Sequence, residues 1–143
     1  MNEMVVIVRR DFDPLAQRLG LRGPVVALRN TAFTLGYFGA TVGMEVLVEF
    51  DYFFVHVMPF RMQGEGKLPN GFVGATQQVQ QMYLQEALDK LRIGYLSEAE
   101  KLKSLGGKYQ NCEAMTSVLV SMVEKSWGAI VDNVDDLFPL ATV

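Results

Sequence analysis

His56 and two glutamates of the same region, Glu45 and Glu49, are the side chains best suited to acid–base chemistry in this sequence. Apolar residues alternate here with a period of two, so we expect all three on one face of a sheet. Glu45 and Glu49 are four residues apart, roughly 13 Å along one strand, which is too far for both to ligate one ion. His56 with either glutamate could transfer a proton. Because such a pair lacks the third group that usually orients a catalytic base, we assign no catalytic residue and interpret it as a solvated or interface ion pair.

The chain contains few candidate metal ligands or nucleophiles. Cys112, the single cysteine, cannot form an intrachain disulfide and lies in a helical apolar pattern, which is typical of a buried small hydrophobic residue. Cys112 and His56 are too few for a zinc site. Asp132, Asp135 and Asp136 lack the alternating oxygen spacing of a calcium loop. We therefore predict no metal and no cofactor.

The glycine-rich segment 62–71 has the composition of an exposed loop. Its glycines, Gly64, Gly66 and Gly71, lack the spacing of a phosphate-binding loop, and the final Ser or Thr is missing. Glu65 would also repel a phosphate. We interpret the segment as an ordinary loop.

The elements that must position these side chains begin with residues 32–60, whose alternation predicts an antiparallel meander of three strands. With tight turns at Gly39-Ala40 and Asp51-Tyr52, one apolar face forms from these cross-strand pairs: Tyr37 with Val42, Leu35 with Met44, Phe33 with Val46, Phe50 with Phe53, Val48 with Val55, and Val46 with Val57. Asp51-Tyr52 is not a favoured two-residue turn, so we expect a longer or bulged loop there.

The opposite face of this sheet mixes two carboxylates with large apolar side chains, whereas a solvated face would be mostly polar. We expect a helix, the tail of the chain or another subunit to cover part of it. Our candidates for ligand or interface contacts are Leu47, Phe54, His56, Met58, Phe60 and Trp127.

Helices are predicted before and after the meander in the sequence. We expect a two-turn helix from Asp13-Pro14 to Gly20, an edge strand at Val25–Leu28, and helices over Gln77–Leu91, from a Ser97–Glu100 capping box to Leu105, and over Asn111–Phe138. The last helix carries two apolar stripes, and a break near Gly128, with Asp132 capping a new helix, would relieve its unfavourable C-terminal carboxylates. The predicted fold is one α+β domain over residues 1–143: a short N-terminal helix, an antiparallel meander of three to four strands, and C-terminal helices packed on the sheet.

Composition limits the possible partners. Thirteen basic and sixteen acidic residues give a net charge of −3, and no basic stripe is present, so we expect no nucleic-acid binding. No apolar run approaches the ~20 residues of a membrane helix, which predicts no membrane partner. Met4–Val8 is too short for the apolar region of a signal peptide, and the basic pair Arg9-Arg10 follows it instead of preceding it. We expect a cytoplasmic location.

The stretch from Ala40 to Arg61, ATVGMEVLVEFDYFFVHVMPFR, followed by GKLP at 66–69, resembles the central hairpin and loop of certain small stand-alone bacterial proteins. In those proteins a short N-terminal helix precedes an antiparallel sheet and C-terminal helices. Many have no known function, and some are suspected immunity partners of toxins or products of mobile gene cassettes. The resemblance implies a bacterial binding protein and transfers no functional residue.

We therefore expect a non-enzymatic binding or interaction protein, of an immunity-like kind. Two alternatives stay open: a small-molecule-binding protein with an apolar pocket between sheet and helices, and a small hydrolase or isomerase that uses His56 with Glu45 or Glu49. We also expect a homodimer, because the last helix has two apolar stripes and one domain has only one core to fill. Its interface would include that helix, with Trp127 at or near it.

Overall fold

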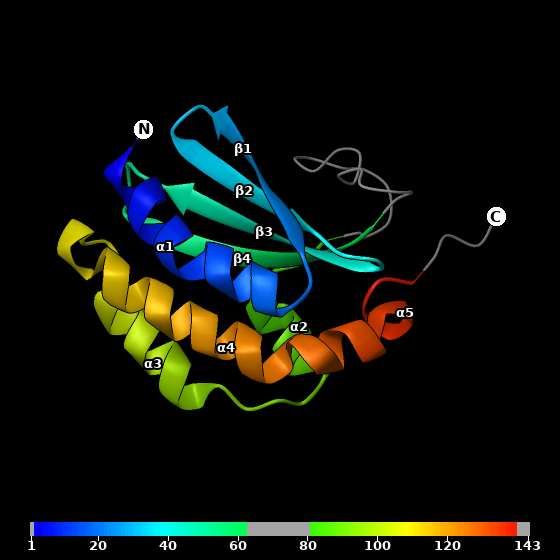
Figure 1. Cartoon of the computed structure of the whole chain (residues 1–143). Coiled ribbons are helices and arrows are strands. Elements are labelled where there is room, and N and C mark those ends of the chain that lie inside the picture. The colour runs from blue at the N-terminus through cyan, green and yellow to red at the C-terminus, as the bar shows by residue number, and fades with distance from the viewer. Residues whose placement is uncertain (1, 63–80, 140–143) are drawn as a thin grey trace.

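A computed structural model describes residues 2–62 and 81–139, and it confirms the predicted α+β architecture. The strands β1 (Arg22–Arg29), β2 (Ala32–Phe38), β3 (Val42–Glu49) and β4 (Phe54–Arg61) form one antiparallel sheet in the order β1-β2-β3-β4. The helices are α1 (Glu3–Arg18), α2 (Leu84–Lys90), α3 (Leu96–Leu105), α4 (Cys112–Asp132) and α5 (Val134–Leu137). The helices α1 and α4 pack over one face of the sheet (Figure 1). Within the described ranges, no helix is long and apolar enough to cross a membrane.

One face of the sheet is apolar and lies under the helices. Val46, Val48, Val55 and Val57 are at most 4% exposed, which confirms the predicted burial of this face. Side chains of α1 and α4 complete the same hydrophobic core, among them Met4, Val8, Phe12, Leu15, Leu119, Met122 and Trp127. We call this the core face and its reverse the second face.

The hairpin of β3 and β4 has the predicted register. Val48 pairs with Val55, and Val46 pairs with Val57. The connection is the four-residue loop 50–53, whose last residue has a left-handed φ of 57°, so the loop is longer than two residues, as expected.

The predicted register of β2 and β3 is wrong by two residues. Tyr37 pairs with Met44 instead of Val42, and the connection extends over residues 39–41. Gly39 lies in this connection, directly after the end of β2. It packs so closely that an added Cβ would lie 2.4 Å from the carbonyl oxygen of Val42. A shift of two residues returns every side chain to the same face, so the predicted faces hold.

The N-terminal helix is more than twice the predicted length, and its first residue is Glu3 instead of Pro14. Asn2 caps α1 by accepting a hydrogen bond from the backbone N–H of Met4 at 2.8 Å, and Pro14 lies inside the helix instead of at its first turn. A continuous stripe of apolar side chains is buried along α1. Its burial stabilises the helix, although Pro14 has no backbone N–H and cannot form the helical hydrogen bond at its position. The stripe consists of Met4, Val5, Val8, Phe12, Leu15 and Ala16.

Other element boundaries also differ from expectation. The start of the predicted helix at 77–80 and nearly all of the predicted loop at 62–71 lie outside the described residues, and α2 begins at Leu84. Because α3 begins at Leu96, Ser97 lies within the helix and does not cap it. The edge strand β1 extends beyond the predicted Val25–Leu28 at both ends.

The long C-terminal helix α4 continues through Gly128. Gly128 is exposed and an added Cβ would meet nothing within 4 Å, so no tertiary contact bends the helix there. The break comes at Asn133, whose side-chain amide donates to the carbonyl of Ala129 at 2.8 Å, and α5 follows. The predicted break near Gly128, with Asp132 capping a new helix, is therefore wrong: Asp132 is the last residue of α4, and the break at Asn133 places only Asp135 and Asp136 in the next helix.

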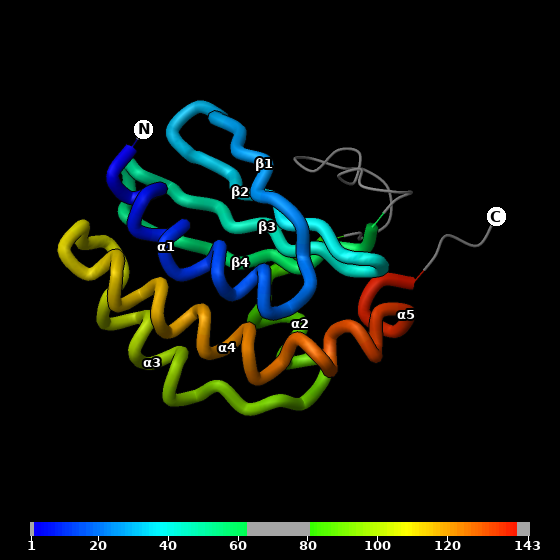
Figure 2. The backbone as a smooth tube through the Cα atoms, viewed as in Figure 1, coloured from blue at the N-terminus to red at the C-terminus, as the bar shows by residue number. Residues whose placement is uncertain are grey.

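A buried hydroxyl joins α1 to the sheet. Tyr37 on β2 donates a hydrogen bond to Oδ1 of Asp13 at 2.6 Å, and Arg9 donates to Oδ2 at 3.0 Å. Burial, followed by the hydrogen bond to Asp13, raises the pKa of Tyr37 well above its usual range. Figure 2 shows α1 beside α4, so segments distant in sequence pack together over the sheet.

Two glycine substitutions are expected to change stability in opposite directions. On β3, an Ala Cβ at Gly43 would lie 2.3 Å from the buried ring of Phe60 and 2.7 Å from the carbonyl oxygen of Tyr37. Gly43→Ala should therefore lower the free energy of unfolding by about 1–3 kcal/mol, because neither neighbour can move freely. Gly128→Ala should raise it by about 0.5–1 kcal/mol, because alanine favours an exposed helix position. Urea denaturation measures both, and a stable Gly43→Ala protein would contradict the packing of Phe60 on β3.

Candidate binding site on the second sheet face

The second face carries side chains of mixed exposure. Its members are Thr34, Phe38, Glu45, Leu47, Glu49, Phe54, His56, Met58 and Phe60. Thr34, Phe38, Glu45 and Phe60 are buried, Phe54 is exposed, and the others are half-buried. The helices α1 and α4 pack on the core face and leave this face to other contacts.

Glu45 is a carboxyl group buried on this face. It is 2% exposed, and its cross-strand neighbours are Gly36 and Met58, neither of which carries a charge. Gln81 donates a hydrogen bond from Nε2 to Oε1 of Glu45 at 3.1 Å. Desolvation raises the pKa of Glu45 to about 7, against the opposing effects of the Gln81 hydrogen bond and the charge of Arg29. Near neutral pH, Glu45 therefore exists in both protonation states.

His56 is the centre of a second, more exposed group. Its Nε2 lies 3.2 Å from Oε2 of Glu49, and both side chains are about one-third exposed, at 30% and 33%. The ring of Phe54 stacks on the imidazole with centroids 6.0 Å apart, and the ring of Tyr83 meets it edge-on at 5.6 Å. The ring of Phe54 packs directly against Gly106 at the end of α3, since a Cβ added at Gly106 would lie 2.3 Å from this ring. Aromatic rings on two sides and a carboxylate thus fix the imidazole.

The geometry separates the two glutamates. Leu47 lies between them on β3 and pairs with His56, so Glu45 is a diagonal neighbour of His56, while Glu49 contacts it directly. Glu49 is the diagonal neighbour on the other side of Leu47, and of the two glutamates it is the one hydrogen-bonded to His56. Among the described side chains, Glu49 is the one hydrogen-bond partner of His56, and no third polar group orients the pair.

The sequence-predicted candidates fall into two groups. Leu47, Phe54, His56 and Met58 keep surface on the second face. Phe60 is 0% exposed, and Trp127 is 5% exposed within the core of the single chain. Trp127 faces the interior because α1 and α3 flank α4 and take up its apolar stripes, so it offers no surface to a ligand or a second subunit.

Sequence reasoning missed Gln81, Tyr83 and Arg29 as neighbours of this site. Gln81 forms an antiparallel bridge with Phe60, which brings the chain back along β4 just before α2. The polar Gln81 and the apolar pattern of Tyr83 were both consistent with faces of a predicted helix, so the local sequence contains no signal for their placement.

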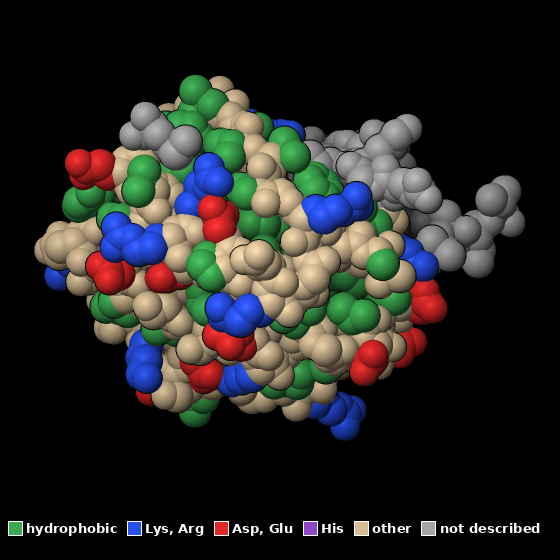
Figure 3. All heavy atoms as spheres, in the orientation of Figure 1, with side chains coloured by type: hydrophobic (Ala, Val, Ile, Leu, Met, Phe, Trp, Pro, Cys, Tyr) green, Lys and Arg blue, Asp and Glu red, His purple; other side chains and the backbone are tan. Residues whose placement is uncertain are grey.

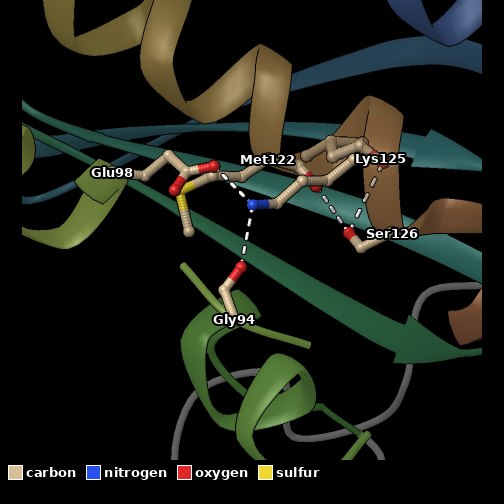
Figure 4. Close-up of polar contacts among 6 residues, drawn as sticks. Gly94, Glu98, Met122, Lys125 and Ser126 are labelled. Atoms are coloured by element: carbon tan, nitrogen blue, oxygen red, sulfur yellow. Dashed lines mark hydrogen bonds and ion pairs between the residues drawn. The ribbon is translucent and has the colours of Figure 1, made fainter. Parts of the chain in front are cut away.

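The helix layer contains a separate polar hollow of about 400 Å³, lined by Ser97, Glu98, Lys101, Ser117, Val118 and Ser121. Its acidic member is already engaged, because Lys125 forms an ion pair with Glu98 and donates to the carbonyl oxygen of Gly94 at 2.9 Å. Figure 4 shows this contact, which joins α4 to α3 and to the segment before it. We interpret the Lys125 contact as a structural link between helices.

Metal and thiol chemistry gain no support from the described residues. Within residues 2–62 and 81–139, no group of three or more His, Cys, Asp or Glu is arranged to hold a metal ion. Cys112 is buried, and desolvation raises the pKa of its thiol, which favours the unreactive protonated form.

Comparisons with protein-family models, with curated proteins and with solved structures found no match to this chain.

The raised pKa of Glu45 predicts how stability depends on pH. Because folding raises the pKa from 4.5 to about 7, the group contributes stability that is fully present below pH 4.5 and is lost as the pH rises through about 7. Relative to Glu45→Gln, which mimics the neutral acid, the wild type should lose on the order of 2–3 kcal/mol of unfolding free energy between pH 5 and pH 8. Urea titrations of both proteins across this range measure the difference. If the unfolding free energies of the two proteins changed in parallel with pH, folding would not shift the pKa of Glu45, and the prediction would be wrong.

Proposed function

We propose that this protein is a non-enzymatic interaction module that binds a protein partner through its second sheet face. The observation that carries the proposal is the half-exposed group of Phe54, His56 and Tyr83, with Glu49 at its side. Aromatic side chains that remain partly exposed in a fixed arrangement are typical of the residues that contribute most to protein interfaces. Leu47 supplies apolar surface between the polar groups.

The fixed positions of these rings support binding over catalysis. Phe54 packs on Gly106, and His56 is held between two rings, so the group would lose little conformational freedom on binding. The Glu49–His56 pair is part of this surface and would contact a partner at its polar edge.

We further propose an immunity-like role, in which the partner is a toxin. Its support is the resemblance of the Ala40–Arg61 stretch, which contains most of the second-face residues, to small bacterial proteins that include suspected immunity partners. A toxin gene beside the gene for this protein would support the role, and a metabolic operon would favour ligand binding.

Acid–base catalysis is a second candidate, and one observation favours it. Glu45 has a pKa of about 7, which suits proton transfer at neutral pH, and it is a diagonal neighbour of His56. Replacing His56 distinguishes the candidates. In a binding protein, His56→Ala should change affinity by a few-fold, whereas in a catalyst it should reduce turnover by several orders of magnitude.

The binding proposal predicts that the exposed rings dominate affinity. Once a partner is isolated, Phe54→Ala combined with Tyr83→Ala should weaken its binding by about 1,000-fold, because each ring is expected to contribute roughly 2 kcal/mol. Isothermal titration calorimetry measures the dissociation constant. The matched control is Leu96→Ala on α3, which removes a side chain that is 76% exposed and far from the second face. Equal losses in the two proteins would contradict the assignment of the site.

A further inference from the structure

The outer edge of β1 is a surface that the proposed function does not use. Val25, Val26 and Leu28 are 53%, 37% and 63% exposed, so the strand presents apolar side chains on both of its faces. Hydrophobic side chains lie over the β1–β2 hairpin at the top of Figure 3, above the helix layer. The opposite edge of the sheet differs, because Gln81 bridges β4 at Phe60. No described residue pairs with the outer edge of β1.

The strand pairing within the sheet defines which backbone groups of β1 face outward. The backbone N–H of Phe50 donates to the carbonyl of Thr31, so Thr31 points toward β3 and the next residue, Ala32, points toward β1. Ala32 pairs with Arg29, so Arg29 points inward. By alternation, the N–H and C=O groups of Leu28 and Val26 point outward, where they can accept another strand.

We propose that a second copy of this chain binds along this edge, antiparallel to β1, with Ala27 of one copy facing Ala27 of the other. In this register Val26 of each copy pairs with Leu28 of the other, and each pair exchanges two backbone hydrogen bonds. The two sheets join into one continuous sheet around a two-fold axis. The homodimer expected from sequence therefore forms through β1 and not through α4 and Trp127.

The composition of β1 favours this register over its neighbours. Pro24 has no N–H and faces a turn residue, Asn30, of the second copy, so it limits the ladder without interrupting it. If Val26 faced Val26 of the second copy instead, Pro24 would lie opposite Leu28 of that copy, and a backbone hydrogen bond would be lost. If Leu28 faced Leu28, Val26 would lie opposite the turn residue Asn30 of the second copy.

The charges of β1 permit pairing with an identical strand. In the proposed register, Arg29 lies opposite Val25 of the second copy, and the two Arg29 residues are roughly 13 Å apart along the sheet. This separation exceeds the screening length of about 8 Å at physiological ionic strength, so their repulsion is small. The strand pair is smaller than a standard interface of about 1,600 Å², and the dimer is accordingly weak.

Cysteine cross-linking tests the register. In the proposed dimer, Ala27 faces its own copy in a pair without backbone hydrogen bonds, where Cα atoms lie about 4.5 Å apart, within the range that a disulfide requires. Ala27→Cys should form a disulfide-linked dimer under mild oxidation on a non-reducing gel. Val25→Cys is the matched control and should form at least about tenfold less, because its neighbour is Arg29. The wild type, whose Cys112 is buried, should form none. Equal cross-linking of both variants, or of neither, would overturn the register.

Sedimentation equilibrium tests the association itself without oxidation. The wild type should dimerise reversibly below about 1 mM, and Leu28→Lys should raise the dissociation constant at least about tenfold, since it places a charge in the apolar pair. Leu96→Lys, at another exposed leucine on α3, should leave the constant unchanged. Circular dichroism checks that each variant is folded. A wild type that stays monomeric over this range, or a dimer insensitive to Leu28→Lys, would contradict the proposal.

Discussion

The burial of one sheet face under α1 and α4 is the contact on which the remaining structure depends. Leu35, Met44, Val46 and Val57 are fully or almost fully buried there, and removing such a side chain from a core costs about 2–5 kcal/mol. That is a large share of the 5–15 kcal/mol by which a domain is stable. Because the strands alternate, every residue buried on this face has a neighbour on the other, so the positions of Glu45, Leu47 and His56 follow from the packing of the core.

Packing α1 and α4 on one face leaves the sheet with two kinds of remaining surface. On the second face, a buried carboxyl group, an imidazole and two aromatic rings stand close together, with Gln81 and Tyr83 contributed from the segment before α2. At the β1 edge, the surface consists of outward-facing backbone N–H and C=O groups and aliphatic side chains. The first suits recognition of specific side chains, and the second suits pairing with an extended strand. The two surfaces involve opposite ends of the strand order, so both can be occupied at once.

Period-two alternation predicted the sheet faces because a one-residue error would have exposed Val46 and Val48. It could not distinguish registers that differ by two, because such registers place every side chain on the same face. Pro14 suggested a helix start because proline is common in the first turn, while the stripe from Met4 to Leu15 determined the real start. In the site, His56 and its sheet partners were predictable from the pairing of β3 and β4. Gln81 and the interior position of Trp127 were not, because both depend on contacts between segments far apart in sequence.

The packing of α1 against α4 has a consequence for synthesis of the chain on the ribosome. The two helices are separated by about 90 residues, which take roughly 5–20 seconds to translate. Throughout that interval, α1 and all four strands have emerged or are emerging, while α4, which completes the hydrophobic core, is missing. The nascent chain therefore exposes hydrophobic surface late into translation, and such transient exposure favours aggregation.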